Sequence, residues 1–271
     1  MKKFFVFATI FFCVTCAGCF QGNSTLIITD DGKVYMRDKF IGVPLLAEQI
    51  ESFKENFAHN PNAEISPVAE NNMSGFEVRV NYPSVESFAA ENFSLFAAHK
   101  DKCAGIRQRK GWFFDSYNFD FISSGDQSFS PSEAAAVQSV LSQVTFDLTI
   151  ELPHAAENHN ADKIDAARKV LTWNLAPSLL SGTDKHMRVE FKIWHRDKIF
   201  LTALAEILLL AATIFFTVKT RTEDFDSLGK DLRLKRNIFA GLFVALLIIS
   251  AYMLLAPVTF TDADTISAVL P

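Results

Sequence analysis

Cysteine is scarce in this chain, and three of its four cysteines (Cys13, Cys16 and Cys19) stand near the N-terminus. Only Cys103 remains in the polar stretch that follows, so modification of Cys19 would leave no partner for an intramolecular disulfide there. Cys103 is therefore expected to be a small buried apolar residue. The chain also lacks a Gly-x-Ser-x-Gly motif, a Gly-rich phosphate loop and an HExxH motif. These absences predict a protein that is not an enzyme and has no cofactor.

Lysine and arginine are absent from the last 15 residues, 257–271, whereas the segment 219–237 holds six of them. The formal net charge of −5 therefore divides unevenly along the chain. Residues 20–197 contain 17 Lys and Arg against 24 Asp and Glu, a net −7, and residues 219–237 contain six against four, a net +2. The acidic total argues against nucleic acid as a partner. The uneven distribution is typical of a protein that sorts charge across a bilayer.

Two long apolar runs predict transmembrane helices at 199–218 and 238–256. The first has Glu206 as its one acidic residue, and the second has no charge. At about 1.5 Å per residue, each run is about 30 Å long, the thickness of a hydrocarbon core. Positive-inside logic places the loop 219–237 in the cytoplasm and the tail 257–271 outside. The predicted location is the cell membrane, with the main domain on the extracytoplasmic face.

The N-terminus has the layout of a secretory signal peptide over residues 1–18. Lys2 and Lys3 precede an apolar run of eleven residues, too short to span a bilayer. The following Ala17, Gly18 and Cys19 resemble a bacterial lipobox, although Cys16 stands where the pattern prefers Leu. We expect lipidation of Cys19; the alternatives are cleavage after Ala17 and an uncleaved helix.

Residues 19–198 are long enough for one domain with its own core. Strict alternation of apolar residues predicts strands at 76–82, 144–152 and 187–194. Asp30-Asp31-Gly32 predicts a hairpin turn between strands at 25–29 and 33–37. Further strands are expected at 63–69, 105–110, 112–122 and 168–175, and helices at 44–58, 84–99 and 130–143. The predicted fold is an α+β extracytoplasmic domain, an antiparallel sheet with helices on one face, plus two C-terminal transmembrane helices.

Several features together resemble a family of bacterial envelope proteins that carry an LppM-type lipoprotein domain. They are the lipobox-like end, the segment 146–153 (FDLTIELP), Asn160-Ala161, the segment 170–175 (VLTWNL) and the membrane anchor. The resemblance covers about residues 19–198. It implies a surface lipoprotein domain with lipid or glycolipid binding, and it implies no catalytic residues. The chain departs from the family in its Cys16 and in its second span.

A basic and aromatic cluster is the first candidate site, because such side chains rest on anionic headgroups at a membrane surface. We expect membrane-surface contact from Arg107, Arg109, Lys110, Trp112 and Trp194. The alternative is an ordinary hairpin with exposed basic and buried aromatic side chains.

Glu206 is the second candidate, since a carboxyl group inside a membrane span requires a polar partner. Counting from the outer ends of both spans puts Ser250 and Tyr252 at a similar depth. An intramembrane polar contact among these three side chains is therefore expected. The pair Gly241 and Ala245 has the small-xxx-small spacing that admits close helix approach.

Two groups of residues suggest metal binding or catalysis as alternatives. His154 and His159 lie near Glu157 and Asp162, but their spacing matches no standard zinc pattern, so a solvated loop and no metal are expected. A hydrolase built on Cys103 would need a His and a carboxylate that nothing in the sequence brings to it.

The sequence as a whole predicts a non-enzymatic, membrane-anchored envelope lipoprotein. Its partners would be membrane lipids, a lipid or glycolipid ligand, or a partner protein at the membrane surface. The alternative is a signalling or assembly subunit that binds another membrane protein through its transmembrane helices.

Overall fold

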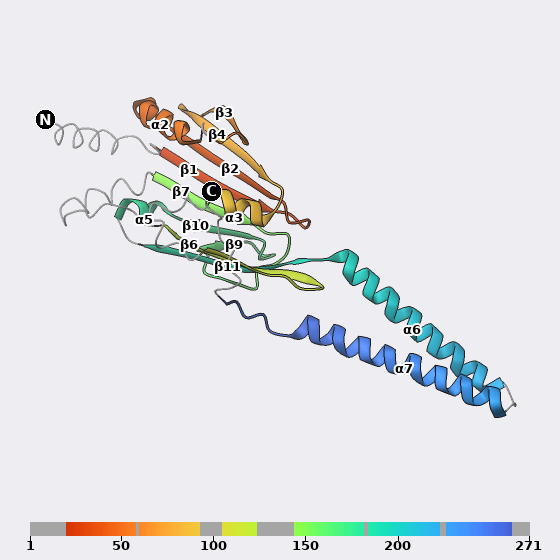
Figure 1. Cartoon of the computed structure of the whole chain (residues 1–271). Helices are drawn as coiled ribbons and strands as arrows, with labels where there is room; N and C mark the ends of the chain where they lie inside the picture. The colour runs from red at the N-terminus through yellow and green to blue at the C-terminus, as the bar shows by residue number, and fades with distance from the viewer. Residues whose placement is uncertain are drawn as a thin grey trace. The chain divides into compact units, whose positions relative to one another are not determined.

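The computed structural model describes residues 20–57, 60–92, 105–123, 144–181, 184–222 and 226–261. Within these residues the chain forms two compact units (Figure 1). An α+β unit comprises residues from 20–108 and 117–193, and a helical unit comprises residues 109–116 and 194–260. The predicted signal peptide 1–18, the lipidation site Cys19, the residue Cys103 and the predicted helix 130–143 lie outside the described residues.

A seven-stranded sheet forms one layer of the α+β unit, in the order β3-β4-β2-β1-β7-β10-β9. Its strands are β1 (Phe20–Ile28), β2 (Val34–Gly42), β3 (Ala63–Glu70), β4 (Met73–Tyr82), β7 (Val144–Glu151), β9 (Lys163–Ile164) and β10 (Val170–Asn174). All neighbours pair antiparallel except β1 and β7, whose parallel register joins Phe20 to Val144 and Ile27 to Glu151.

A second sheet has four strands in the order β5-β6-β11-β8. Its strands are β5 (Gly105–Arg109), β6 (Phe114–Ser123), β8 (Asn158–His159) and β11 (Lys185–Trp194). Apolar side chains of both sheets, including the fully buried Trp173 of β10 and Phe119 of β6, belong to one continuous core. The polar network described below lies between β10 of the first sheet and β11 of the second.

The turn between β1 and β2 follows from its sequence. Gly32 adopts φ +80°, a conformation that glycine tolerates without steric cost, and its amide donates to Thr29 O at 3.0 Å. The turn sets the register in which Ser24 faces Asp38. Because both residues point to the buried side of the sheet, a carboxyl group enters the core at this position.

The helices of the α+β unit use the apolar positions that periodicity indicates. They are η1 (Pro44–Leu46), α2 (Ala47–Phe57), α3 (Val85–Asn92) and α5 (Ala176–Ser181). In α2, Ile50 and Phe57 are buried, and the Phe57 ring lies 6.1 Å from that of Phe76 on β4. In α3, Val85, Phe88 and Ala89 are buried.

The helical unit contains two long helices that lie side by side, α6 (Arg196–Thr222) and α7 (Asp226–Leu255) (Figure 1). Both are long and apolar enough to cross a membrane, and their apolar windows are not buried inside the protein. The rings of Phe216 and Phe239 stack between them at 5.4 Å. The less exposed positions of α7 recur at steps of three and four residues, which is the spacing of a helix–helix seam.

The predicted α+β class and the two apolar C-terminal helices are confirmed. The expected single antiparallel sheet is, however, two sheets, and one pair of strands is parallel. Alternation shows which side of a strand is buried but carries no information about its direction or its partner. The predicted strand 168–175 begins only at Val170, because Arg168 has φ +56° and belongs to a turn. The helix α7 begins at Asp226, well before the predicted 238, so much of the expected loop is helical.

Candidate functional site

The end of the β5–β6 hairpin, residues 109–116 (here the hairpin tip), contacts the first turns of α6. The Trp112 Nε1–H donates to Thr202 Oγ1 at 3.2 Å, and Thr202 donates in turn to Lys198 O at 2.8 Å. The Lys198 ammonium lies 5.6 Å from the centroid of the Trp112 ring, within cation–π range. Trp112 nevertheless keeps 49% of its surface exposed. An indole held in this way has one apolar face available to the surroundings.

The same hairpin tip reaches the segment that follows α7. The Arg109 guanidinium donates to Thr259 O at 3.1 Å, across 150 positions of sequence. One hairpin therefore touches the start of α6 and the chain just beyond the end of α7. These two helix ends lie on the same side of the helical pair, which is the arrangement that two antiparallel spans require.

The junction between β11 and α6 is bonded to the hairpin tip as well. His195 Nε2 and Asp115 Oδ1 are 3.1 Å apart, and the His195 amide donates to Phe113 O at 2.8 Å. The rings of Phe114 and Trp194 meet edge to face at 5.0 Å. These contacts attach the residues just before α6 to the hairpin tip within the helical unit.

A polar pair joins the two helices. Ser250 Oγ donates to Glu206 Oε1 at 3.0 Å, and both side chains are partly buried. Tyr252, by contrast, is 74% exposed. The geometry therefore selects Ser250 from the two partners that depth alone left open.

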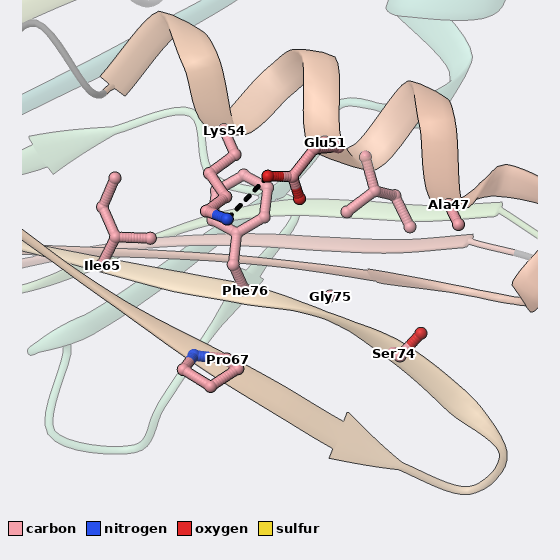
Figure 2. A pocket seen from close by; sticks show the side chains of 9 residues that line it. Ala47, Glu51, Lys54, Ile65, Pro67, Ser74, Gly75 and Phe76 are labelled. Atoms are coloured by element: carbon pink, nitrogen blue, oxygen red, sulfur yellow. Dashed lines mark hydrogen bonds and ion pairs between the residues drawn. The ribbon is translucent and has the colours of Figure 1, made fainter.

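A groove of about 380 Å³ lies between α2 and the β3–β4 hairpin (Figure 2). Its lining is mostly apolar and is formed by Ala47, Ile50, Ile65, Pro67, Gly75 and Phe76, with Glu51, Lys54 and Ser74 as polar members. Lys54 Nζ and Glu51 Oε1 form an ion pair at 2.7 Å along the helix side of the groove. This volume falls within the range of small-molecule sites, and the lining combines apolar side chains with a few polar ones.

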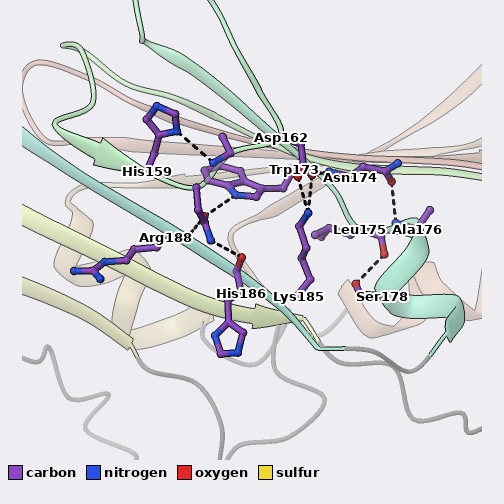
Figure 3. A network of polar contacts seen from close by, with 12 residues as sticks. His159, Asp162, Trp173, Asn174, Leu175, Ala176, Ser178, Lys185, His186 and Arg188 are labelled. Carbon is purple, nitrogen blue, oxygen red and sulfur yellow. Dashed lines mark hydrogen bonds and ion pairs between the residues drawn. The ribbon is translucent and has the colours of Figure 1, made fainter.

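A network of polar contacts connects the two sheets around Trp173 (Figure 3). Asn160 Oδ1 accepts from Trp173 Nε1 at 3.0 Å and from the Arg188 amide at 2.7 Å, and Asn160 Nδ2 donates to His186 O at 2.8 Å. Nearby, Lys185 Nζ lies 2.6 Å from Asp162 Oδ1. Burial opposes ionisation of Asp162, but the bonds from Lys185 and the Asn174 amide outweigh it, so the pKa of Asp162 lies below its usual value. This network joins β10 to β11 through hydrogen bonds and so contributes to the fold.

The buried carboxyl group of Asp38 is a separate feature of the core. Asp38 is 3% exposed, and Ser24 Oγ donates to its Oδ1 at 2.6 Å. Burial raises the pKa of Asp38 to about 6, and the bond from Ser24 offsets part of that rise.

The residues weighed for metal binding are each held by another group. His154 lies 3.3 Å from Asp30, Glu157 pairs with Lys192 at 2.6 Å, and the Ala161 amide donates to His159 Nδ1 at 3.3 Å. Within the part of the chain that the structure describes, no three His, Cys, Asp or Glu side chains are grouped as metal ligands.

Of the predicted membrane-surface residues, the structure brings Arg109, Lys110 and Trp112 together in the hairpin tip and places Trp194 beside Phe114. Arg107 is half-buried on β5 and belongs to the α+β unit. Sequence reasoning missed Thr202, His195, Asp115 and Thr259 as partners of the hairpin tip. The brevity of the link from β11 to α6 was the one signal that something must hold this junction.

Comparison with solved structures gives a distant likeness. No protein family matches the chain, and no curated protein matches it. The NMR structure of the folded domain of the Mycobacterium tuberculosis LppM protein is similar, with a TM-score of 0.41 and 12% sequence identity. The match covers 67% of this chain and 94% of that one. The expected resemblance to an LppM-type domain is thus met by a distant structural likeness, which establishes neither a family nor a function.

Proposed function

We propose that this chain is a non-enzymatic, membrane-anchored envelope lipoprotein whose α+β domain binds a lipid or glycolipid, or a partner protein, at the membrane surface. One observation carries the proposal. The hairpin tip, with its exposed Trp112, is bonded both to the start of α6 and to the segment beyond α7. Tryptophan is favoured at the boundary between water and bilayer, so a tip fixed at the helix ends would stand at that boundary.

The charge distribution supports an extracytoplasmic domain. Residues 219–237, which include the connection between α6 and α7, carry a net +2, whereas residues 257–271 have no Lys or Arg. In this orientation the −7 segment of residues 20–197 lies outside the cytoplasm. Lipidation of Cys19 would add a second membrane anchor.

The groove beside α2 supports the ligand part of the proposal. Its apolar lining suits a hydrocarbon chain, and the Lys54–Glu51 pair offers hydrogen-bonding groups to a polar head. Gly75 lines the groove without a side chain, and a Cβ at this position would meet the Phe40 carbonyl oxygen.

Photolabelling of the purified full chain tests the ligand. A fatty-acid probe with a photoactivatable diazirine in its chain is expected to label peptides within 47–57 and 63–76. The substitution Ala47→Trp would fill the groove from an exposed wall position and abolish this label. Glu48→Trp is the matched control, because Glu48 is the exposed neighbour that does not line the groove. Labelling confined to α6 and α7, or labelling unchanged by Ala47→Trp, would reject the ligand site.

The alternative function, a signalling or assembly subunit that binds a partner through its helices, centres on Glu206. The bond from Ser250 gives this carboxyl group a partner within its own chain, which favours the first function. Co-purification from membranes distinguishes the two. If Glu206→Leu releases a protein that the unsubstituted chain retains, the assembly function is supported instead.

A further inference from the structure

We propose that the hairpin tip and the first turn of α6 form a binding surface for anionic lipid headgroups. The inference rests on the membrane anchoring proposed above and is independent of any ligand in the α2 groove. It specifies the lipid chemistry that the anchored domain would select.

Charge is the first argument. The surface carries four cationic side chains, of which three are exposed and Lys198 is half-buried: Arg109, Lys110, Arg196 and Lys198. It carries two carboxylates, Asp115 and Asp197. Asp115 accepts from the Gly111 amide at 3.1 Å and lies 3.1 Å from His195, so its charge is directed into the hairpin tip. The surface is therefore cationic, although the residues 20–197 carry a net −7.

Two of the four cations are held in place by contacts within the helical unit. Lys198 lies against the Trp112 ring, and Arg109 uses one of its five N–H donors on Thr259 O. The remaining guanidinium donors suit the paired oxygens of a phosphate group. Preorganised cations lose less side-chain freedom on binding than free surface lysines do, which favours a specific site over diffuse attraction.

The position of Lys198 along α6 is the third argument. Lys198 is followed at once by Ile199, Phe200 and Leu201, which are 36%, 70% and 58% exposed. At about 1.5 Å per residue, the change from cation to exposed apolar side chain takes place within about 5 Å. A bilayer changes from phosphate to hydrocarbon in the same direction, so the helix would present its cations to phosphates and its apolar side chains to acyl chains.

An acidic protein could also be attracted by four cations. The continuity of the cationic surface with the exposed apolar face of α6 favours a lipid, because one lipid molecule presents a phosphate and a hydrocarbon chain together. An acidic protein would satisfy only the charges and leave that apolar face uncovered.

Quenching of Trp112 fluorescence by brominated lipids tests the proposal. The full chain with Trp194→Phe would be reconstituted into phosphatidylcholine vesicles that contain either brominated phosphatidylglycerol or brominated phosphatidylcholine. We expect stronger quenching by the brominated phosphatidylglycerol, since it would be enriched at the hairpin tip. Trp173 is fully buried in the α+β unit and supplies a constant background.

Charge substitutions identify the site. Arg109→Gln with Lys198→Gln should abolish the excess quenching by phosphatidylglycerol, and Arg109→Lys with Lys198→Arg should retain it. Lys33→Gln with Arg79→Gln removes the same charge from the α+β unit and should leave the excess unchanged. Equal quenching by the two lipids in the unsubstituted tip, or an excess that survives the double Gln variant, would overturn the proposal.

Two further outcomes separate this inference from its premises. If alkaline carbonate extracts the chain from membranes, the anchoring itself fails. If the chain stays anchored but added polyglutamate, and not brominated phosphatidylglycerol, changes Trp112 emission, the surface binds an acidic protein and the lipid assignment is wrong.

Discussion

Asn160 Oδ1 accepts a hydrogen bond from the indole of Trp173 at 3.0 Å, and Trp173 is fully buried. The same oxygen accepts the Arg188 amide of β11, while the Asn160 amide group donates to His186 O. One side chain thus joins β10 of the first sheet to β11 of the second. Such a bond satisfies the one donor that a buried tryptophan has, and it is supplied here by an asparagine that is itself exposed.

Replacing Asn160 by Ala should therefore destabilise the α+β unit strongly. The indole N–H and the Arg188 amide would both lose their acceptor, and a buried unsatisfied group costs about 1–3 kcal/mol. Urea unfolding of the full chain in detergent, followed by the fluorescence of Trp173, measures the loss. Asn158→Ala is the control, because Asn158 is an exposed residue of the adjacent β8. Equal midpoints for the two variants would show that Asn160 does not join the sheets.

The pH dependence of stability should reveal Asp38. Its pKa of about 6 in the folded protein exceeds the ordinary 3.8, so the folded state binds the proton more tightly than the unfolded state does. The contribution of Asp38 to the free energy of unfolding is then greatest below pH 4, falls between pH 4 and pH 6, and is lowest above pH 6. The difference between the two pKa values corresponds to about 3 kcal/mol. Asp162 acts in the opposite sense, because its lowered pKa makes its contribution disappear as the pH falls below 4.

The substitution Asp38→Asn isolates the buried carboxyl group from the other titrating groups. Asparagine can still accept the bond from Ser24 but carries no charge at any pH. The variant should be more stable than the unsubstituted chain at pH 7, by up to about 3 kcal/mol, and should lose that advantage at pH 3. Unfolding midpoints at the two pH values provide the measurement. A constant difference between the proteins across this range would mean that Asp38 is not the group that titrates.

The elements that the sequence predicted well are those with long, regular patterns. The predicted strand 144–152, which contains β7, alternates over nine residues, and Leu148, Ile150 and Leu152 are buried. The two apolar helices are defined by length and composition alone. In contrast, β8 and β9 have two residues each, too few for any periodicity, and they exist because β11 and β10 offer them hydrogen-bonding edges.

The candidate site was predictable only in its chemistry. The residue types of the hairpin tip indicated a membrane surface, but its bond to Thr259 spans 150 positions and depends on how two helices return the chain to the same level. The groove beside α2 likewise depends on the packing of a helix over a hairpin. Local sequence encodes neither the bond to Thr259 nor the groove, because both result from tertiary contacts.

Gly75 should tolerate no side chain. A Cβ at this position would lie 1.9 Å from the Phe40 carbonyl oxygen, and a backbone atom of a paired strand cannot move aside as a flexible side chain does. We expect Gly75→Ala to cost about 1–3 kcal/mol, the usual range for overpacking. Thermal unfolding measures this, with Gly241→Ala as the comparison, since a Cβ at Gly241 would meet nothing within 4 Å. A Gly75→Ala midpoint as high as that of Gly241→Ala would contradict the close approach of β2 and β4.

The bond between Glu206 and Ser250 should hold α6 against α7. Glu206→Leu and Ser250→Ala would each remove this bond. The loss of stability in the double variant should therefore be smaller than the sum of the two single losses, and the difference is the coupling energy. Double-mutant cycles of interhelical hydrogen bonds in bilayers average about 0.6 kcal/mol, with a maximum near about 1.7 kcal/mol. Unfolding of the full chain in lipid bicelles measures the four proteins of the cycle. The pair Glu206→Leu and Gly241→Ala is the control, because Gly241 lies on an open face of α7 and should show no coupling. Additive losses for Glu206 and Ser250 would mean that the two side chains are not coupled in the membrane. A carboxyl group without this partner would favour the assembly function.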